Sequence, residues 1–208
     1  MTHPLKLLIA THNPAKKQEL GNGFSFLLQK NVNLLFLDDL HIKNDPEETG
    51  KTFLENARLK AYYFAKLTSL PTVADDGGIE IDILNGQPGV HSKRWLGRNA
   101  SDEEMISFTL EKLKKIPQGK RNAQLTVCLY YVNPLTGYEA AITESLKGYI
   151  SNSPSGFARK GFPYRALFIV EKYNKYYDEL TDKEHHVANH RLKAVQKLIP
   201  LIKEDLLQ

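Results

Sequence analysis

The chain has 208 residues, of which 41% are hydrophobic and 25% charged, and its formal net charge is +4. These values are ordinary for globular proteins and exclude a chain that is disordered throughout. The length favours one domain spanning residues 1–208. The single cysteine, Cys128, excludes an intrachain disulfide and a cysteine-based zinc site.

No apolar run approaches the ~20 residues that a membrane span requires. The first residues lead into only a short apolar segment and lack the features of a signal peptide. We therefore expect a soluble cytoplasmic protein with no membrane partner.

The basic residues are spread along the chain, and the densest patch lies at 112–115 with Lys120 and Arg121. Such a patch is typical of a solvated helix end, whereas nucleic-acid binding would need tighter clustering and interleaved aromatic residues. RNA binding is an alternative suggested only by the isoelectric point near 9.0, and salt-sensitive binding to oligonucleotides would support it. We expect no nucleic-acid partner.

The first half of the chain alternates short apolar runs with longer amphipathic segments. Pro14 suits the first turn of a helix. Thr52, Asn56 and Lys60 are four residues apart, so they share one face of a second helix. Strands are predicted at 5–10, 33–37, 71–74 and 79–84, helices at 14–28 and 52–67, and a loop at 38–50.

In the second half, Ser101 and Glu104 have the spacing of a capping box and predict a helix to about residue 115. Strands are predicted at 123–132 and 138–150, joined as a hairpin, and at 164–170; a loop covers 151–161, and a last helix covers 187–207 with a break or bend near Pro200. Helices and strands are mixed, so we predict an α/β fold with a mixed central β-sheet flanked by helices.

Two adjacent carboxylates, Asp75 and Asp76, stand where an apolar strand is predicted to end, and Gly77 and Gly78 follow them. The glycines would allow a tight turn and the close approach of a ligand. Adjacent carboxylates repel each other, and a divalent cation held by oxygen ligands, Mg²⁺ or Mn²⁺, would relieve that repulsion. The alternative is a polar turn with solvated aspartates.

The loop between the first predicted strand and helix carries Thr11, His12, Asn13 and Lys16. Ligands in open α/β folds favour such strand ends, and N–H groups at a helix start attract phosphate. The loop contains no glycine, which excludes a Walker loop and a dinucleotide fingerprint. An ordinary turn with an exposed lysine is the alternative.

Two further signals are charged pairs at predicted helix starts. Glu47 and Glu48 precede the second helix, where the helix dipole favours acids even without a function. His190 and Arg191 could hold a base or a phosphate, or lie on the surface. Phosphate-binding, carboxylate and cationic residues together are what a phosphoryl-transfer or pyrophosphate-releasing site needs.

Taken in order, these motifs resemble those of the noncanonical purine nucleoside triphosphate pyrophosphatases, also called the inosine triphosphate pyrophosphatase family. The family motifs are T-x-N-x-x-K, E-T-G, F-x-E-N-A-x-x-K-A, A-D-D-S-G, P-G-x-x-S-A-R and S-H-R. The segments of this chain that resemble them lie, in the same order, within residues 10–16, 47–50, 52–61, 70–78, 87–94 and 189–191. The resemblance covers nearly the whole chain, and such a series is specific to the family.

The resemblance implies an elongated two-lobed single domain, a homodimer, and Mg²⁺-dependent hydrolysis of a nucleoside triphosphate to the monophosphate and pyrophosphate. The implied substrates are inosine and xanthosine triphosphates, ribo or deoxy. Asp76 would orient or deprotonate the attacking water. The implied metal ligands are Glu48, Asp75 and Asp76, and the implied phosphate-binding residues are Thr11, His12, Asn13, Lys16, Lys60 and Arg94.

The base-recognition segment departs from the family pattern. Where the family reads G-F-G-Y-D-P-x-F, residues 161–168 read G-F-P-Y-R-A-L-F. Phe162 could still stack on a purine and Tyr164 is kept, but Arg165 replaces an aspartate, so a five-donor cation stands where an acceptor is usual.

Further departures flank that segment. The lysine expected before the S-H-R motif falls at about His185, and its serine is Asn189. Gly77 replaces the serine of the carboxylate motif and removes a hydroxyl that could donate to a phosphate. The loop before Gly161 is longer by Arg159 and Lys160.

The phosphate and metal motifs therefore match the family, and the base-binding motif does not. We predict retained pyrophosphohydrolysis with an altered or relaxed base preference, since a site that hydrogen-bonds its substrate discriminates strongly. The residues predicted on the base side are Phe162, Tyr164, Arg165 and His185, whereas His190 and Arg191 are predicted to bind substrate through either the base or a phosphate. One alternative has Arg165 pointing to solvent and the base bound by backbone groups. Another is a non-catalytic nucleotide-binding protein, which the intact acids argue against.

Overall fold

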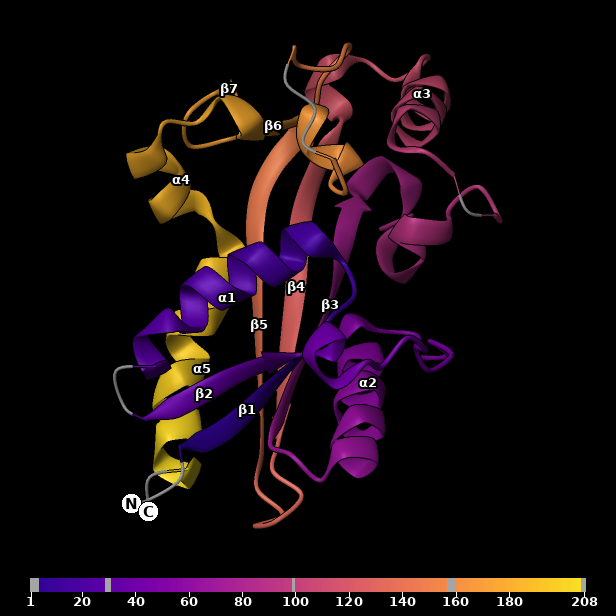
Figure 1. The fold of residues 1–208 in the computed structure, drawn as a ribbon. Coiled ribbons are helices and arrows are strands. Elements are labelled where there is room, and N and C mark those ends of the chain that lie inside the picture. Colours follow the sequence, from indigo (N-terminus) through magenta and orange to yellow (C-terminus); the bar gives the residue numbers. More distant parts are fainter. Residues whose placement is uncertain (1–3, 29–30, 99, 157–159, 207–208) are drawn as a thin grey trace. The chain divides into compact units, whose positions relative to one another are not determined.

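The structure is a computed structural model that describes residues 4–28, 31–98, 100–156 and 160–206. Within them, seven strands form one sheet in the order β2-β1-β3-β4-β5-β6-β7 (Figure 1). The strands are β1 Leu5–Ala10, β2 Val32–Phe36, β3 Thr72–Ile81, β4 Asn122–Val132, β5 Glu139–Ile150, β6 Phe168–Val170 and β7 Lys175–Tyr176; the helices are α1 Pro14–Leu28, α2 Phe53–Thr68, α3 Asp102–Leu113, α4 Asp182–Ala188 and α5 His190–Leu206.

Strand directions confirm the predicted mixed sheet. β1 pairs in parallel with β2 and β3, whereas β6 pairs antiparallel with β5 and β7. The part of the chain that the structure describes contains no helix both long enough and apolar enough to cross a membrane.

The chain divides into two compact units. Unit 1 comprises Met1–Asp76, Val127–Glu144 and Arg191–Gln208, and unit 2 comprises Gly77–Thr126 and Ser145–His190. Strands β3, β4 and β5 each contribute residues to both units. The prediction that residues 1–208 form one domain stays a prediction.

In unit 1, helices cover both faces of the parallel strands. Figure 1 shows α1 and α5 on one side of β1 and β2 and α2 on the other. Strand β1 is fully buried from Leu7 to Ala10, as expected for a parallel strand covered on both faces. The core on the α1 and α5 side consists of Leu7, Ile9, Leu20, Phe24, Val32, Val73, Val127, Leu129, Tyr131, Ala194, Val195, Leu198 and Ile202.

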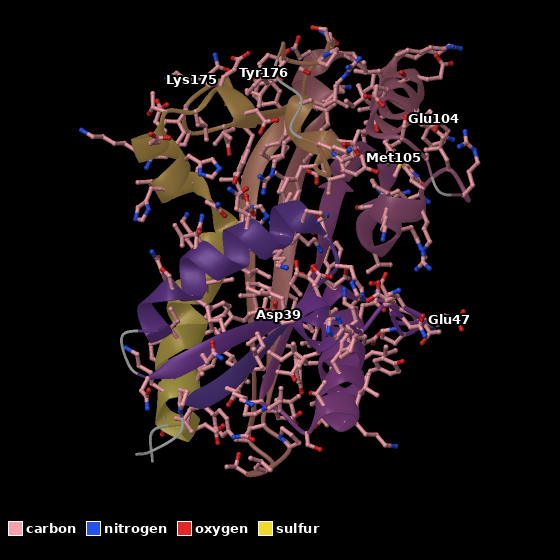
Figure 2. The ribbon with its side chains drawn as sticks, in the orientation of Figure 1. Asp39, Glu47, Glu104, Met105, Lys175 and Tyr176 are labelled. Atoms are coloured by element: carbon pink, nitrogen blue, oxygen red, sulfur yellow. The ribbon has the colours of Figure 1, made fainter. Side chains whose placement is uncertain are left out.

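Unit 2 has its own core, and α3 begins as predicted. Ser101 Oγ accepts from the N–H of Glu104, and the Glu104 carboxylate accepts from the N–H of Ser101, so the capping box is confirmed (Figure 2 labels Glu104). Residues that build this core include Ile79, Ile81, Met105, Leu113, Leu125, Ile150, Tyr164, Leu167, Phe168, Val170 and Tyr177.

The basic patch at the end of α3 is partly a solvated surface. Its lysines are exposed, as predicted. Arg121, however, is buried, and its guanidinium donates to the carbonyl oxygens of Leu113, Ile116 and Ser151. Arg121 therefore holds backbone of unit 2 together and adds no charge to the surface.

The prediction of a turn at residues 75–78 is wrong. β3 runs without interruption from Thr72 to Ile81. The strand predicted at 79–84 is therefore the end of β3, and its last residues, Asp82–Leu84, form a 3-10 turn. Gly78 serves close packing, because a Cβ built there would lie 2.1 Å from Ser92 Oγ and 2.7 Å from the Gly89 carbonyl oxygen. The strand continues through its charged residues because they are buried and neutralised.

Two predicted boundaries also differ. Residues 163–166 form a 3-10 turn, and only Phe168–Val170 is strand, since Pro163 begins a tight helical turn instead of extending the backbone. The last helical segment breaks at Asn189, whose extended ψ of 102° separates α4 from α5, whereas Pro200 lies within α5. Arg159, predicted as part of a longer loop, lies outside the described residues.

Candidate active site

Strand β3 places two adjacent carboxylates on opposite faces of the sheet in unit 1. Successive side chains on a strand point to opposite faces. Asp75 accordingly meets Lys16 of α1 and Arg191 of α5, whereas Asp76 meets Asn56 and Lys60 of α2. Both aspartates are buried, so the alternative of a polar turn with solvated aspartates is wrong.

Asp75 is held by two cations. Lys16 Nζ lies 3.0 Å and Arg191 Nη2 lies 3.4 Å from Asp75 Oδ2. Burial alone would raise the pKa of Asp75, but Lys16, Arg191 and Lys60 outweigh it and lower that pKa to about 2. Asp75 is therefore a permanent anion, and Glu19 fixes the far side of Arg191 at 2.8 Å.

Asp76 has a different electrostatic environment. Asn56 Nδ2 donates to Asp76 Oδ2 at 3.1 Å, and Lys60 Nζ lies 3.8 Å from Asp76 Oδ1. Burial raises the pKa of Asp76, assisted by Glu48, and this outweighs the opposing effects of Lys60 and Lys16. The two neighbouring carboxylates thus have pKa values shifted in opposite directions, an arrangement found where acid and base roles are divided.

Lys60 stands between two carboxylates. Its Nζ donates to Glu48 Oε1 at 3.0 Å and also lies near Asp76. Burial alone would lower the pKa of Lys60, but Asp76, Asp75 and Glu48 together raise it. Lys60 is therefore charged, and Glu48 is turned towards it, whereas Glu47 is exposed at the surface (Figure 2).

The predicted phosphate loop begins α1. Asn13 Oδ1 accepts from the N–H groups of Ala15 and Lys16, so Asn13 caps the helix and occupies two of its first N–H groups. Thr11 Oγ1 accepts from the N–H of Asn13. His12 Nε2 lies 3.7 Å from Asp45 Oδ1.

Lys16 is the part of that loop aimed at the charged cluster. Its side chain is 17% exposed and pairs with Asp75, so the alternative of an ordinary turn with an exposed lysine is wrong. Burial, the largest cause, lowers the pKa of Lys16, although Asp75 opposes that effect.

The donor chemistry of this cluster suits Mg²⁺, because Glu48 and Asp76 offer carboxylate oxygens on either side of Lys60. Among residues 4–28, 31–98, 100–156 and 160–206, no three His, Cys, Asp or Glu side chains form a ready metal-binding group. Mg²⁺ is usually bound through one or two carboxylates, water and substrate phosphates. The residues present therefore fit Mg²⁺ brought in with a triphosphate better than an all-protein metal cage.

In unit 2, the predicted base-side residues gather around Tyr177. The Arg165 guanidinium carbon lies 3.6 Å from the centroid of the Phe162 ring and 4.6 Å from that of the Tyr177 ring. The rings of His185 and His190 contact Tyr177 at centroid distances of 5.1 and 6.5 Å. Arg165 is 3% exposed, so the alternative in which it points to solvent is wrong.

The other predicted residues of unit 2 have separate surroundings. Tyr164 is buried, and its hydroxyl donates to the Ser92 carbonyl oxygen at 2.7 Å, which makes it a structural residue of this unit. Arg94 is exposed, and Gly77 lies within β3. A substrate-binding role for Tyr164, Arg94 and Gly77 stays a prediction.

Asn56, Glu19 and Tyr177 were not predicted as site residues, although each contacts one. The four-residue spacing of Asn56 and Lys60 was the one available signal, because it places both on the same face of α2. Glu19 and Tyr177 contact Arg191 and Arg165, which are distant in the sequence, so no local pattern indicated these contacts.

The chain is similar to known proteins over nearly its whole length. The model of the Ham1 family matches residues 7–201. Proteins named dITP/XTP pyrophosphatase from Yersinia pseudotuberculosis and Thermus thermophilus are 36% and 38% identical over 200 and 204 residues, covering 96% and 98% of this chain and 98% and 95% of theirs. The structure of a HAM1 protein from Coxiella burnetii matches with a TM-score of 0.82 and 31% identity, covering 96% of this chain and 99% of that one. This chain belongs to the Ham1 family.

Proposed function

We propose that this protein hydrolyses noncanonical purine nucleoside triphosphates, such as the inosine and xanthosine nucleotides, to the monophosphate and pyrophosphate. The observation that carries the proposal is the buried charge cluster of unit 1, where adjacent aspartates meet Lys16, Lys60 and Arg191. Its support is the near full-length similarity to proteins named dITP/XTP pyrophosphatase.

The cations of the cluster provide the charge that a triphosphate needs. Lys16 and Lys60 each pair with a carboxylate in the free protein. On binding, their ammonium groups would turn towards phosphate oxygens, with which they form charge-assisted hydrogen bonds. Thr11, His12 and Asn13 would shape the loop that presents Lys16.

Asp76 takes the proton of the attacking water. The water oxygen forms a bond to phosphorus, the bond between the α-phosphate and the bridging oxygen breaks, and pyrophosphate leaves. A carboxylate with a raised pKa accepts a proton more readily than its permanently ionised neighbour, so Asp76 is the better base and Asp75 the better anchor for cations.

Mg²⁺, or Mn²⁺ in its place, would be held by Glu48 and Asp76 together with the phosphates. Asp75 faces Lys16 and Arg191, and its role as a further metal ligand stays a prediction. When bound, the metal neutralises phosphate charge and lowers the pKa of nearby water. Without the metal, Lys60 lies between the carboxylates of Glu48 and Asp76 and reduces the repulsion between them.

The base preference of this chain differs from the one that the family pattern implies, because Arg165 stands where that pattern has an aspartate. Arg165 covers one face of Phe162, so a purine could stack only on the other face of that ring. His185 and His190, whose rings contact Tyr177 in the same unit, add further donors. These residues favour bases that present acceptors, since Arg has donors only.

Pyrophosphate release with Mg²⁺ across a panel of nucleoside triphosphates tests the function. The panel holds inosine, xanthosine and deoxyinosine triphosphates, the standard bases, and modified purines and pyrimidines. We expect pyrophosphate, and no orthophosphate, from at least one member. Nucleotide binding without pyrophosphate release from any member would contradict the proposal and support the non-catalytic alternative.

The family resemblance also leads us to propose a homodimer in the cytoplasm. Light scattering coupled to gel filtration tests the first part, because a dimer has twice the 23.6 kDa mass of the chain. A monomer at micromolar concentration would contradict it.

A further inference from the structure

Asn56 of α2 is nearly inaccessible and uses both ends of its side-chain amide. Its Nδ2 donates to Asp76 Oδ2 at 3.1 Å, and its Oδ1 accepts from the N–H of Gly50 at 2.8 Å. The side chain is therefore the direct link between a carboxylate of β3 and the backbone of the segment at residues 46–51, which we call the Glu48 segment.

The orientation of this amide is fixed by its partners. The backbone N–H of Gly50 is a donor, and the Asp76 carboxylate offers only acceptors, so reversing the amide would lose both hydrogen bonds. Asn56 is 1% exposed, which excludes replacement of either bond by bulk water. One rigid side chain thus sets the distance between Asp76 and the Glu48 segment.

Gly50 is fitted to the same contact. A Cβ built on Gly50 would lie 2.6 Å from Asn56 Oδ1 and 2.7 Å from Glu55 Cβ. Any larger residue would push the backbone away from the amide, so the close approach requires glycine at this position. Gly50 and Asn56 are therefore both needed for the hydrogen bond that joins the Glu48 segment to α2.

We propose that Asn56 is a positioning residue, which holds the Asp76 carboxylate and the Glu48 segment in the arrangement that hydrolysis requires. The inference rests on the proposed function, since it acts through Asp76 and Glu48. Asn56 keeps one oxygen of Asp76 occupied, so that Oδ1, on the side of Lys60, is the oxygen left to take part in chemistry. Misplacing a reacting group by about 1 Å costs about 100-fold in rate.

The chain offers a matched control in the same unit. Asn133 is also buried, and its Nδ2 donates to the carboxylate of Asp205 at 2.7 Å while its Oδ1 accepts from the N–H of Leu135 at 3.0 Å. Asn133 has the same kinds of partner as Asn56, but these partners lie outside the charge cluster. Any cost of removing a buried bridging amide is common to both.

The experiment compares Asn56→Ala and Asn56→Asp with Asn133→Ala and Asn133→Asp. Each full-length variant is assayed for pyrophosphate release with Mg²⁺ and the best substrate of the wild-type protein, and its melting temperature is measured. Asn56→Asp keeps the acceptor for Gly50 and places a carboxylate against Asp76, so it tests the link to Asp76 without removing volume. Amide hydrogen exchange at Gly50 provides a readout that is independent of activity.

We expect both Asn56 variants to lose about 10- to 100-fold in kcat with KM changed by less than about threefold. The variants misplace Asp76 relative to the Glu48 segment, whereas the lysines proposed to bind phosphate are unchanged. The Asn133 variants should keep kcat within about twofold at a similar loss of melting temperature. Exchange at Gly50 should accelerate in Asn56→Ala and stay slow in Asn56→Asp.

Two outcomes would overturn the inference in distinguishable ways. An active wild-type protein whose Asn56 and Asn133 variants have the same kcat would remove the positioning role alone. A wild-type protein that releases no pyrophosphate would remove the proposed function and the positioning role with it. Gly50→Ala adds a second probe. Its effect on kcat should not add to that of Asn56→Ala, since both substitutions break the same contact between Gly50 and Asn56.

Discussion

Asp75 and Asp76 are adjacent in sequence, yet they meet different partners because a strand turns alternate side chains to opposite faces. Asp75 lies against cations of α1 and α5, which lower its pKa to about 2. Asp76 lies against α2, where burial raises its pKa despite Lys60. A single residue step along β3 therefore separates a carboxylate with a lowered pKa from one with a raised pKa.

At the residue scale, Lys16→Ala should raise KM for the Mg²⁺–triphosphate about tenfold or more, because a charged phosphate contact is lost. The neighbouring Lys17→Ala is the matched control, since Lys17 pairs with the exposed Asp38 at 2.9 Å. Steady-state kinetics check both variants. Equal KM values in Lys16→Ala and Lys17→Ala would show that Lys16 does not hold phosphate.

Arg165→Asp should move the base preference towards inosine or xanthosine triphosphate, as measured by the ratio of kcat/KM values between those nucleotides and the standard ones. Arg165 is stacked on Phe162, so a carboxylate there removes the cation and frees the ring face. Arg165→Met keeps an apolar chain against the rings and tests the donors alone. Unchanged ratios in both folded variants would exclude Arg165 from base selection.

At the element scale, Asp205 ties α5 to the hairpin of β4 and β5. Its carboxylate accepts from Tyr131 Oη at 2.5 Å, Asn133 Nδ2 at 2.7 Å and Thr136 Oγ1 at 2.6 Å. Burial would raise the pKa of Asp205, but these three donors outweigh it and lower that pKa. The ionised carboxylate is therefore the form that stabilises unit 1.

Asp205→Asn should lower the free energy of unfolding by about 1–3 kcal/mol at neutral pH. A carboxyl group whose folded pKa is depressed stabilises the fold above its unfolded pKa, and that stability is lost as pH falls through the folded pKa. The difference between wild type and variant should therefore shrink below about pH 4. Urea unfolding at several pH values checks this, with the exposed Glu204→Gln on the same helix as control; a pH-independent difference would contradict the prediction.

The elements that depend on local signals could be predicted from the sequence. Pro14, the Ser101 capping box and the hairpin loop are local, and α1, α3, β4 and β5 were confirmed within about two residues. A strand was predicted to stop at Asp75 because Gly77 and Gly78, which follow the two aspartates, would allow a tight turn. The cations that keep it going come from α1, α2 and α5, which no local pattern reveals.

The candidate site likewise has residues that the sequence motifs indicated and residues that only the structure revealed. The motifs indicated Lys16, Glu48, Lys60, Asp75, Asp76 and Arg191, and unit 1 brings these together. The partners that orient them, Asn56 and Glu19, became visible only in three dimensions. Likewise, Arg165 was recognised as a departure, but its stacking between Phe162 and Tyr177 depends on a residue twelve positions further along the chain.

At the scale of the whole molecule, Lys16, Lys60 and Arg191 belong to unit 1, whereas Phe162, Arg165, His185 and His190 belong to unit 2. The near full-length match to the Ham1 family covers both sets. Hydrolysis and base preference are therefore expected to change independently. Substitutions in the charge cluster should lower turnover of every substrate, and substitutions around Tyr177 should reorder the substrates.

Asp76→Asn tests whether Asp76 activates the water for pyrophosphate release. The variant keeps the size of the side chain but cannot accept the proton of water. With Mg²⁺ and the best substrate, we predict a loss of about 100- to 10,000-fold in kcat, with nucleotide binding and the melting temperature retained. Pyrophosphate release at a near wild-type rate would show that Asp76 does not activate the water.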